Sequence, residues 1–209
     1  FRMKILLFDF DGVITDTFEF CHGIENMRHP LTQEEYRAMF EGNINEAIRQ
    51  THASAPERMQ FDYFAFYTPE LLKRQPYEGM REIIQTLAKT HELVIISSAI
   101  SSSIDAFLTM RGLRQEFKEI LGKDVEESKI KKIQDVLLRY HASPEEAVLV
   151  TDTLGDIREA NKCAVRSIAV TWGFHPFETL QKGNPYQIID RPDQIIQTIQ
   201  SMDRGASRS

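Results

Sequence analysis

An apolar run that ends in two aspartates constrains this chain more than any other feature. Asp9 and Asp11 follow the run at residues 3–8 and stand one residue apart, directly before Gly12. A short apolar run bounded by glycine is typical of a buried strand, so both aspartates are placed where that strand ends. Alternate residues of a strand point the same way, and we expect the two carboxylates to lie together. Open α/β sheets bind ligands at this edge.

Two adjacent carboxylates repel each other unless a cation or a shared proton lies between them. Hard carboxylate oxygens of this kind suit Mg²⁺. One carboxylate could then act as a nucleophile while the other transfers protons. Because Asp and Gly are also common turn formers, the alternative is a strand end with two solvated turn aspartates. Three later segments of the chain argue against that alternative.

From residue 76 onward the sequence alternates between helical periodicity and short apolar runs. Helices are predicted over residues 79–90, 103–112, 128–140 and 156–162, and buried strands over residues 93–96, 147–150 and 166–170. Such alternation implies right-handed crossovers between parallel strands. The predicted fold class is therefore α/β, with helices packed on a parallel sheet.

The segment between the first strand and residue 76 has a different character. It lacks the alternation of a strand and is rich in aromatic residues and methionine, with helical spacing at Tyr36, Met39 and Phe40. We predict a small all-helical insertion over residues 17–75, and a core formed by residues 1–16 and 76–209. Most of the aromatic residues are interpreted as packing this small helical bundle.

Polar side chains follow several of the predicted strands. The residues at or just beyond the strand ends are Asp9, Asp11, Ser97, Ser98, Asp152 and Asp156. Because the ends of parallel strands share one edge of a sheet, we expect these side chains to converge there. Lys129 opens the predicted helix over residues 128–140 and lies at the same edge.

Together these segments resemble the haloacid dehalogenase superfamily of phosphatases, in particular members similar to phosphoglycolate phosphatase with a helical cap after the first strand. The segment Asp-Phe-Asp-Gly-Val that starts at Asp9 matches the first family motif, Asp-x-Asp-Gly-Thr/Val. Ser97 matches the Ser/Thr of the second motif, and Lys129 occupies the place of the lysine of the third. The resemblance implies a Rossmann-like three-layer core with a parallel sheet, and a cap over residues 17–75.

The fourth family motif, Gly-Asp-x-x-x-Asp, is matched by residues 151–156 with one departure. Thr151 stands where the family usually has glycine, and Asp152 and Asp156 supply the two carboxylates. The match runs in the right order from about residue 3 to residue 173. Each motif alone is a weak signal, whereas the ordered set is specific.

The resemblance implies a covalent mechanism of phosphate ester hydrolysis. Asp9 would attack phosphorus and form an aspartyl-phosphate, while Asp11 would protonate the leaving alcohol and then deprotonate the hydrolytic water. Ser97 and Lys129 would donate to the phosphoryl oxygens. Ser98 is of the same residue type as Ser97, and we expect it to contact the substrate.

The resemblance also implies Mg²⁺ as the cofactor. The Asp9 carboxylate, the Asp11 backbone carbonyl and Asp152 would hold it, with Asp156 acting in the same site through a water or Lys129. The cation lets an anionic nucleophile approach an anionic phosphoryl group. Taken singly, Asp152 is also explained as a turn residue and Asp156 as a helix cap.

Two positions leave their roles open. Lys131 and Lys132 share the predicted helix of Lys129, which is preferred because it lies in the first turn. Residues 42–49 resemble the cap segment that enters the site in phosphoglycolate phosphatase-like proteins. Arg49 is therefore a candidate for an anionic substrate group, and an exposed helix arginine is the alternative. His175 falls in a loop after a predicted strand and could border the site, but a surface loop residue is the preferred interpretation.

Composition excludes several classes of partner. The formal net charge is -6 and no basic tract occurs, so nucleic acid is not an expected partner. No apolar run is long enough to span a bilayer, and no signal peptide is recognised. Cys21 and Cys163 show no metal-binding or disulfide spacing, which fits reduced core thiols and a cytoplasmic location.

The function predicted from these observations is Mg²⁺-dependent hydrolysis of a small phosphate monoester. The expected partner is a small phosphorylated metabolite, and the oligomeric state is left open. A phosphosugar mutase on the same core is one alternative. A catalytically idle regulatory protein on this fold is the other, and the intact set of Asp9, Asp11, Ser97, Lys129 and Asp152 argues against it.

Overall fold

The computed structural model describes residues 4–52 and 61–206. The other residues of the predicted core and insertion, 1–3, 53–60 and 207–209, lie outside the described part. Within it, one sheet holds the strands β1 (Ile5–Phe8), β2 (Glu92–Ile96), β3 (Phe117–Leu121), β4 (Ala147–Thr151), β5 (Arg166–Val170) and β6 (Gln187–Ile189).

Helices surround this sheet and form the segment between β1 and β2. The α-helices are α1 (Phe18–Arg28), α2 (Gln33–Ala38), α3 (Ile44–His52), α4 (Tyr63–Leu72), α5 (Met80–Leu87), α6 (Ser101–Met110), α7 (Lys129–Arg139), α8 (Leu154–Lys162), α9 (Phe177–Leu180) and α10 (Gln194–Ala206). The short 3-10 helices are η1 (Met39–Glu41), η2 (Arg114–Glu116), η3 (Pro144–Glu146) and η4 (Gln181–Gly183).

All neighbouring strands of the sheet are parallel. Their order is β3-β2-β1-β4-β5-β6, and central β1 pairs with both β2 and β4. This is the strand order of a doubly wound Rossmann fold, which confirms the predicted fold class. Because the strand order reverses between β1 and β4, ligands are expected outside the carboxyl ends of these two strands.

The two edge strands, β3 and β6, have no counterpart among the strands predicted from the sequence. The segment of β3 reads Phe-Lys-Glu-Ile-Leu, and β6 is only three residues long. An edge strand has a neighbour on one side only, so it carries more polar residues and a weaker apolar pattern. The inner strands β1, β2, β4 and β5 lie on or next to the predicted apolar runs.

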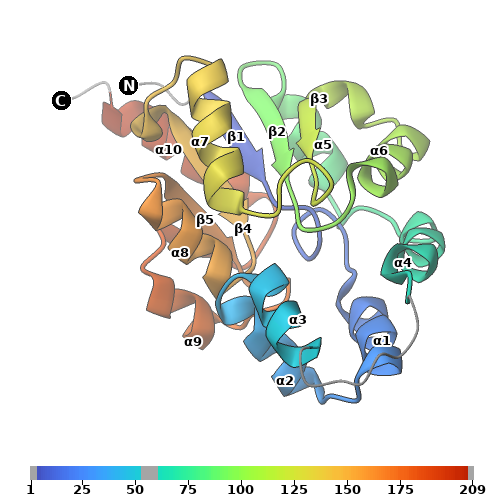
Figure 1. Cartoon of the computed structure of the whole chain (residues 1–209). Helices are drawn as coiled ribbons and strands as arrows, with labels where there is room; N and C mark the ends of the chain where they lie inside the picture. The colour runs from blue at the N-terminus through green and yellow to red at the C-terminus, as the bar shows by residue number, and fades with distance from the viewer. Residues whose placement is uncertain (1–3, 53–60, 207–209) are drawn as a thin grey trace.

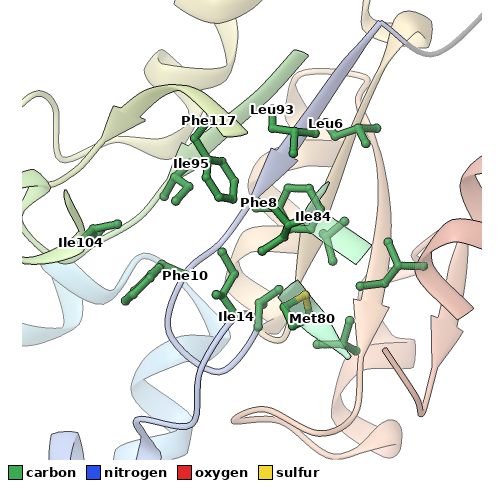
Figure 2. Packing of buried hydrophobic residues seen from close by; sticks show 14 of the residues in the cluster. Leu6, Phe8, Phe10, Ile14, Met80, Ile84, Leu93, Ile95, Ile104 and Phe117 are labelled. Carbon is green, nitrogen blue, oxygen red and sulfur yellow. The ribbon is translucent and has the colours of Figure 1, made fainter. Parts of the chain in front are cut away.

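Alternating side chains of the strands supply two apolar layers. Leu6 and Phe8 of β1 pack on one face, with α5, α6 and α10, as Figure 2 shows for Met80, Ile84 and Ile104. Ile5 and Leu7 point to the other face, where α7 and α8 cover them. The core is therefore a three-layer sandwich of helices, sheet and helices.

The four predicted helices of the core correspond to α5, α6, α7 and α8, with ends that differ by no more than three residues. One difference has a clear cause. The Thr153 side chain accepts a hydrogen bond from the Asp156 amide and caps α8, so this helix begins at Leu154, two residues before the predicted start.

Helices α1 to α4 and η1 make up the segment between β1 and α5. Figure 1 shows these helices beyond the carboxyl ends of the strands, on the side where the predicted site lies. The division into a core domain and a cap domain stays a prediction. No helix in residues 4–52 or 61–206 is long and apolar enough to cross a membrane.

Candidate active site

Three neighbouring strands end in polar side chains that the structure brings to one edge of the sheet. Asp9 follows β1, Ser97 follows β2, and Asp152 follows β4; all three are buried. The Asp9 amide continues the ladder by donating to the Val150 carbonyl over 2.9 Å. The backbone of each strand therefore carries its polar residue to the place where the strand order reverses.

Lys129 links two of the carboxylates. Its Nζ lies 2.8 Å from Asp9 Oδ2 and 2.5 Å from Asp156 Oδ2. Ser128 caps the start of α7, which fixes the first turn from which Lys129 extends. Asp156 Oδ2 also accepts from the Thr151 hydroxyl at 2.8 Å. The threonine that departs from the family motif thus has a place in this network.

Burial and the buried ammonium act on these groups in opposite directions. Burial raises the pKa of Asp9 well above its usual value, although Lys129 acts to lower it. Burial also opposes ionisation of Asp156, but the Lys129 charge and its hydrogen bonds outweigh that effect and lower the pKa of Asp156. The two carboxylates more than offset the desolvation of Lys129, so the pKa of Lys129 is raised and it stays protonated.

Asp152 is enclosed by backbone. Its Oδ2 accepts from the Phe174 amide at 2.6 Å. A Cβ at Gly12 or at Gly173 would overlap the Asp152 carboxylate, and Gly12 has a φ of +73°. Glycine at both positions therefore lets the loops after β1 and β5 close around this side chain. Burial raises the pKa of Asp152 to about 8.

The donor set fits a hard divalent cation. Asp152 Oδ1 is buried and has no hydrogen-bond partner among the described residues, an arrangement that is costly unless another group meets this oxygen. Carboxylate oxygens are the ligands that Mg²⁺ prefers, and it usually keeps several waters. No three acidic, histidine or cysteine side chains converge as a metal-binding group in the described ranges. A cation here would be held by few side chains, with backbone and water oxygens completing its shell.

Asp11 takes a different partner from Asp9. The hydroxyl of Tyr67, from α4, donates to Asp11 Oδ1 at 2.8 Å. Burial raises the pKa of Asp11, whereas the Tyr67 hydrogen bond acts to lower it. A carboxyl group with a raised pKa is suited to give up and take back a proton near neutral pH.

Two adjoining cavities lie beside these residues. The smaller, of about 40 Å³, is lined by Asp9, Lys129 and Asp152, among others. The larger, of about 340 Å³, lies mainly among residues of the helical segment. Asp11 and Ser98 line both. The larger cavity is within the range of ordinary ligand pockets.

The two serines differ in their surroundings. Ser98 lines both cavities, whereas Ser97 is fully buried and lines neither. The Ser97 hydroxyl oxygen accepts from the Ala99 amide at 3.0 Å, and its carbonyl accepts from Lys132 at 2.6 Å. Lys132 is thus a buried residue of this region whose position the sequence did not indicate.

Arg49 stands apart from the other predicted site residues. Its side chain is exposed and pairs with Glu127 at 2.6 Å, and it lines neither cavity. Ile44, Asn45 and Ile48 of α3 border the larger cavity, whereas the Arg49 guanidinium is directed to Glu127.

The helical segment is fastened to the core by several polar contacts. The side-chain amide of Asn43 donates to the Glu159 carboxylate at 2.9 Å, and the side-chain amide of Asn45 donates to the Glu127 backbone carbonyl at 3.2 Å. Arg158 donates to the Glu41 carbonyl at 2.6 Å. These contacts hold η1 and the start of α3 over the edge of the sheet.

The expectation that His175 is a surface loop residue is wrong. His175 is buried, and its Nδ1 accepts from the Leu154 amide at 3.0 Å. The other ring nitrogen, Nε2, must then carry the proton that is donated to the Arg37 carbonyl at 2.9 Å. Burial lowers the pKa of His175. The loop position gave no sign that this ring joins α2 to the start of α8.

Comparisons with known proteins agree on one family. The family model described as haloacid dehalogenase-like hydrolase matches residues 6–170. A phosphoglycolate phosphatase of Synechococcus elongatus is 24% identical, over 97% of this chain and all of that protein. The pyrophosphatase PpaX of Listeria welshimeri is 24% identical, over 93% of this chain and 95% of that protein.

Solved structures show the same fold. A haloacid dehalogenase-like family hydrolase from Streptococcus pneumoniae superposes with a TM-score of 0.76 at 18% identity, covering 94% of this chain and 98% of that chain.

Proposed function

Because this chain belongs to the haloacid dehalogenase-like hydrolases, we propose that it is a Mg²⁺-dependent phosphatase that hydrolyses a small phosphate monoester. The relatives named phosphoglycolate phosphatase and pyrophosphatase support phosphate chemistry at this site. The proposal keeps the predicted cap over residues 17–75, the cytoplasmic location and a small phosphorylated metabolite as the partner.

The observation that carries the proposal is the different environment of the two aspartates. Asp9 lies against the Lys129 ammonium, whereas Asp11 lies against the neutral Tyr67 hydroxyl. Burial raises the pKa of both carboxyl groups, but the Lys129 ammonium acts to lower that of Asp9, and a bound cation would lower it further, so that Asp9 can attack as an anion. Asp11, beside a neutral donor, is suited to carry a proton. Two carboxyl groups held in two such environments divide the work of nucleophile and acid–base.

In the first step, an Asp9 oxygen attacks phosphorus and the bond to the alcohol oxygen breaks. The electron pair of that bond passes to the alcohol oxygen, which takes the proton of Asp11. In the second step, Asp11 accepts a proton from a water that attacks phosphorus. The bond between Asp9 and phosphorus then breaks, and inorganic phosphate and the free Asp9 carboxylate result.

Asp9, the Asp11 backbone carbonyl and Asp152 would hold Mg²⁺, which offsets the negative charge of nucleophile and phosphoryl group. Asp156 lines the smaller cavity and acts in the same site through a water or Lys129, with its Oδ2 already in contact with that ammonium and with Thr151. Lys129 and Ser98, which line the smaller cavity, donate to phosphoryl oxygens. Donation from Ser97 stays a prediction, because its side chain is fully buried and lines neither cavity. Arg49 is assigned no contact with the substrate in this proposal.

The test is phosphate release from a panel of phosphate esters, with Mg²⁺ and with EDTA. The panel contains phosphoglycolate, pyrophosphate, several sugar phosphates and simple alkyl phosphates. We expect metal-dependent release that Asp9→Asn lowers by roughly 10³-fold or more, since this nearly isosteric change removes the nucleophile. If a folded protein releases phosphate from none of these esters, the proposal is overturned. Isomerisation of a sugar phosphate without release would identify a mutase instead.

A further inference from the structure

The larger cavity beside Asp11 has a wall rich in aromatic side chains. Tyr36, Phe40, Tyr63, Phe64 and Phe174 line it, and further apolar side chains of η1 and α3 complete it. These rings already pack on one another edge to face. The ring centroids of Tyr36 and Phe40 lie 5.1 Å apart at 84°, and those of Phe40 and Phe174 lie 5.0 Å apart at 79°.

The position of this cavity relates it to the chemistry. Asp11 and Ser98 border both this cavity and the smaller one that Asp9, Lys129 and Asp152 line. In the proposed mechanism, Asp11 gives its proton to the oxygen of the leaving alcohol. A phosphoryl group at Asp9 would therefore direct the rest of the ester past Asp11 into the aromatic cavity.

The charged side chains of the wall are already satisfied within the protein. Arg28 lies 3.5 Å from Glu25 and stacks over the Phe61 ring, with 5.3 Å from its guanidinium carbon to the ring centroid. Lys123 lies 3.7 Å from Glu127, a carboxylate that also pairs with Arg49 at 2.6 Å. Among the described residues, each cation of the wall thus has a carboxylate partner.

The acidic side chains do not change this picture. The Asp62 carboxylate accepts from the amides of Phe64 and Ala65 and caps α4. Asp11 accepts from Tyr67. A second anionic group on a substrate would have to enter an aromatic space whose cations are already paired, and burying an unpaired charge there is costly.

We propose that this cavity receives the leaving group of the substrate, and that this group is uncharged, apolar and about the size of one or two rings. The inference rests on the proposed function. An apolar cavity of about 150 Å³ is enough to bind benzene in another protein. A volume of about 340 Å³ leaves room for one ring and its linker, or for two fused rings.

The leaving group proposed for this protein differs from the leaving groups of the compounds that the relatives are named for. Glycolate and phosphate, the groups that would leave from phosphoglycolate and pyrophosphate, are anions. Neither finds an unpaired cation in the described wall, so both compounds are expected to be poor substrates. An aromatic alcohol would instead extend the edge-to-face packing of the wall.

The test compares esters that differ mainly in the leaving group. Benzyl phosphate, methyl phosphate, phosphoglycolate and pyrophosphate are hydrolysed under identical conditions with Mg²⁺. We expect kcat/KM for benzyl phosphate to exceed the other three values by roughly 100-fold, the size of effect that burial of one ring supplies. Equal or higher kcat/KM for phosphoglycolate or pyrophosphate overturns the inference while the proposed function stands.

A cavity-filling variant places the effect in this cavity. Ile48→Trp adds an indole to the wall, and we expect the ratio of kcat/KM for benzyl over methyl phosphate to fall by about 10-fold or more. Leu138→Trp is the matched control, because Leu138 is 73% exposed on α7, and it should leave this ratio unchanged. If Ile48→Trp does not fold, Ile48→Phe takes its place. An unchanged ratio in the folded variant overturns the inference.

A binding measurement separates the two proposals if no ester is hydrolysed. Benzylphosphonate and phosphonoacetate carry the same phosphonate but differ in the attached group, and titration calorimetry gives the affinity of each. Tighter binding of benzylphosphonate by roughly 100-fold supports the aromatic cavity even if catalysis fails. Equal affinity, or preference for phosphonoacetate, overturns the inference.

Discussion

The hydroxyl of Tyr67 donates a hydrogen bond of 2.8 Å to Asp11 Oδ1. Tyr67 belongs to α4 of the helical segment, and Asp11 to the loop that follows β1 in the core. The contact therefore connects the segment that covers the site to the residue proposed to transfer protons. A change in either partner should be visible in the pH dependence of catalysis.

Tyr67→Phe should move the alkaline limb of the kcat/KM profile to higher pH. The hydrogen bond from Tyr67 favours the ionised form of Asp11. Its loss should therefore raise the pKa of Asp11 further, beyond the increase that burial already causes. Protonated Asp11 is the active form in the first step, and it then persists to higher pH. A hydrogen bond to a charged group contributes about 1.5 kcal/mol or more, which is enough to move the limb by about one pH unit. Tyr63→Phe, a neighbouring tyrosine of α4, should leave the position of the limb unchanged.

Lys129→Met should destabilise the fold as well as abolish activity. Without the ammonium, Asp9 and Asp156 are two buried carboxylates with no cation, and breaking such a pairing costs about 3–5 kcal/mol in the free energy of unfolding. This loss of free energy of unfolding should become smaller as the pH falls from 8 to 5.5, because a carboxylate that takes up a proton no longer needs the missing cation. Urea unfolding at several pH values measures it.

Lys131→Met is the matched control for Lys129. Lys131 lies two residues further along α7, is exposed, and pairs with Glu126 at 3.5 Å. Its replacement should change the free energy of unfolding by no more than about 0.5 kcal/mol. Similar losses in the two variants would contradict a special role for the buried ammonium.

Binding of Mg²⁺ should release at least one proton at neutral pH, since burial raises the pKa of both carboxyl groups proposed to hold it, Asp152 and Asp9. Burial raises the pKa of Asp152 to about 8, so at pH 7 the carboxyl group is mostly protonated before the cation arrives. The cation binds the carboxylate, and its affinity should rise with pH up to about 8 and then level off. Titration calorimetry in buffers with different ionisation enthalpies counts the proton. A binding enthalpy that is independent of the buffer at pH 7 would contradict the prediction.

The core strands and the polar residues at their ends were predictable because both give local patterns in the sequence. Buried inner strands produce continuous apolar runs, and the polar residue after each run marks the edge where ligands bind. Asp9 and Asp152 were found in this way. Strand β3 was missed because its two charged residues hide the apolar pattern of an edge strand.

The cavity in the helical segment was harder to predict from the sequence, because an aromatic residue that packs in a core and one that lines a cavity have the same helical spacing. Phe40 and Phe64 carry no local sign that space remains between them. The outward position of Arg49 depends on its contact with Glu127, which lies 78 residues away in the sequence. The position of His175 depends on its contacts with α2 and α8, residues far away in the sequence.

Gly155→Ala should weaken the closure of the helical segment over the site. Gly155 lies in the first turn of α8, and a Cβ there would overlap the Gly42 carbonyl oxygen and lie 2.8 Å from that of Phe40. Both carbonyls belong to backbone, which must move away as a unit rather than rotate like a side chain. We expect kcat/KM to fall by about 10-fold or more, since poor closure misplaces the residues around the substrate.

Hydrogen exchange distinguishes loss of closure from a general loss of stability in Gly155→Ala. Amides of residues 40–45 should exchange faster, while those of β1 and β4 should keep their wild-type protection, because only the contact between η1 and α8 is disturbed. Gly23→Ala is the control, since a Cβ at Gly23 would meet no atom within 4 Å. In α1 this change should stabilise the protein by up to about 1 kcal/mol and leave exchange at residues 40–45 unaltered. Wild-type kcat/KM and exchange in Gly155→Ala would show that the approach of Gly42 to α8 is not needed for catalysis.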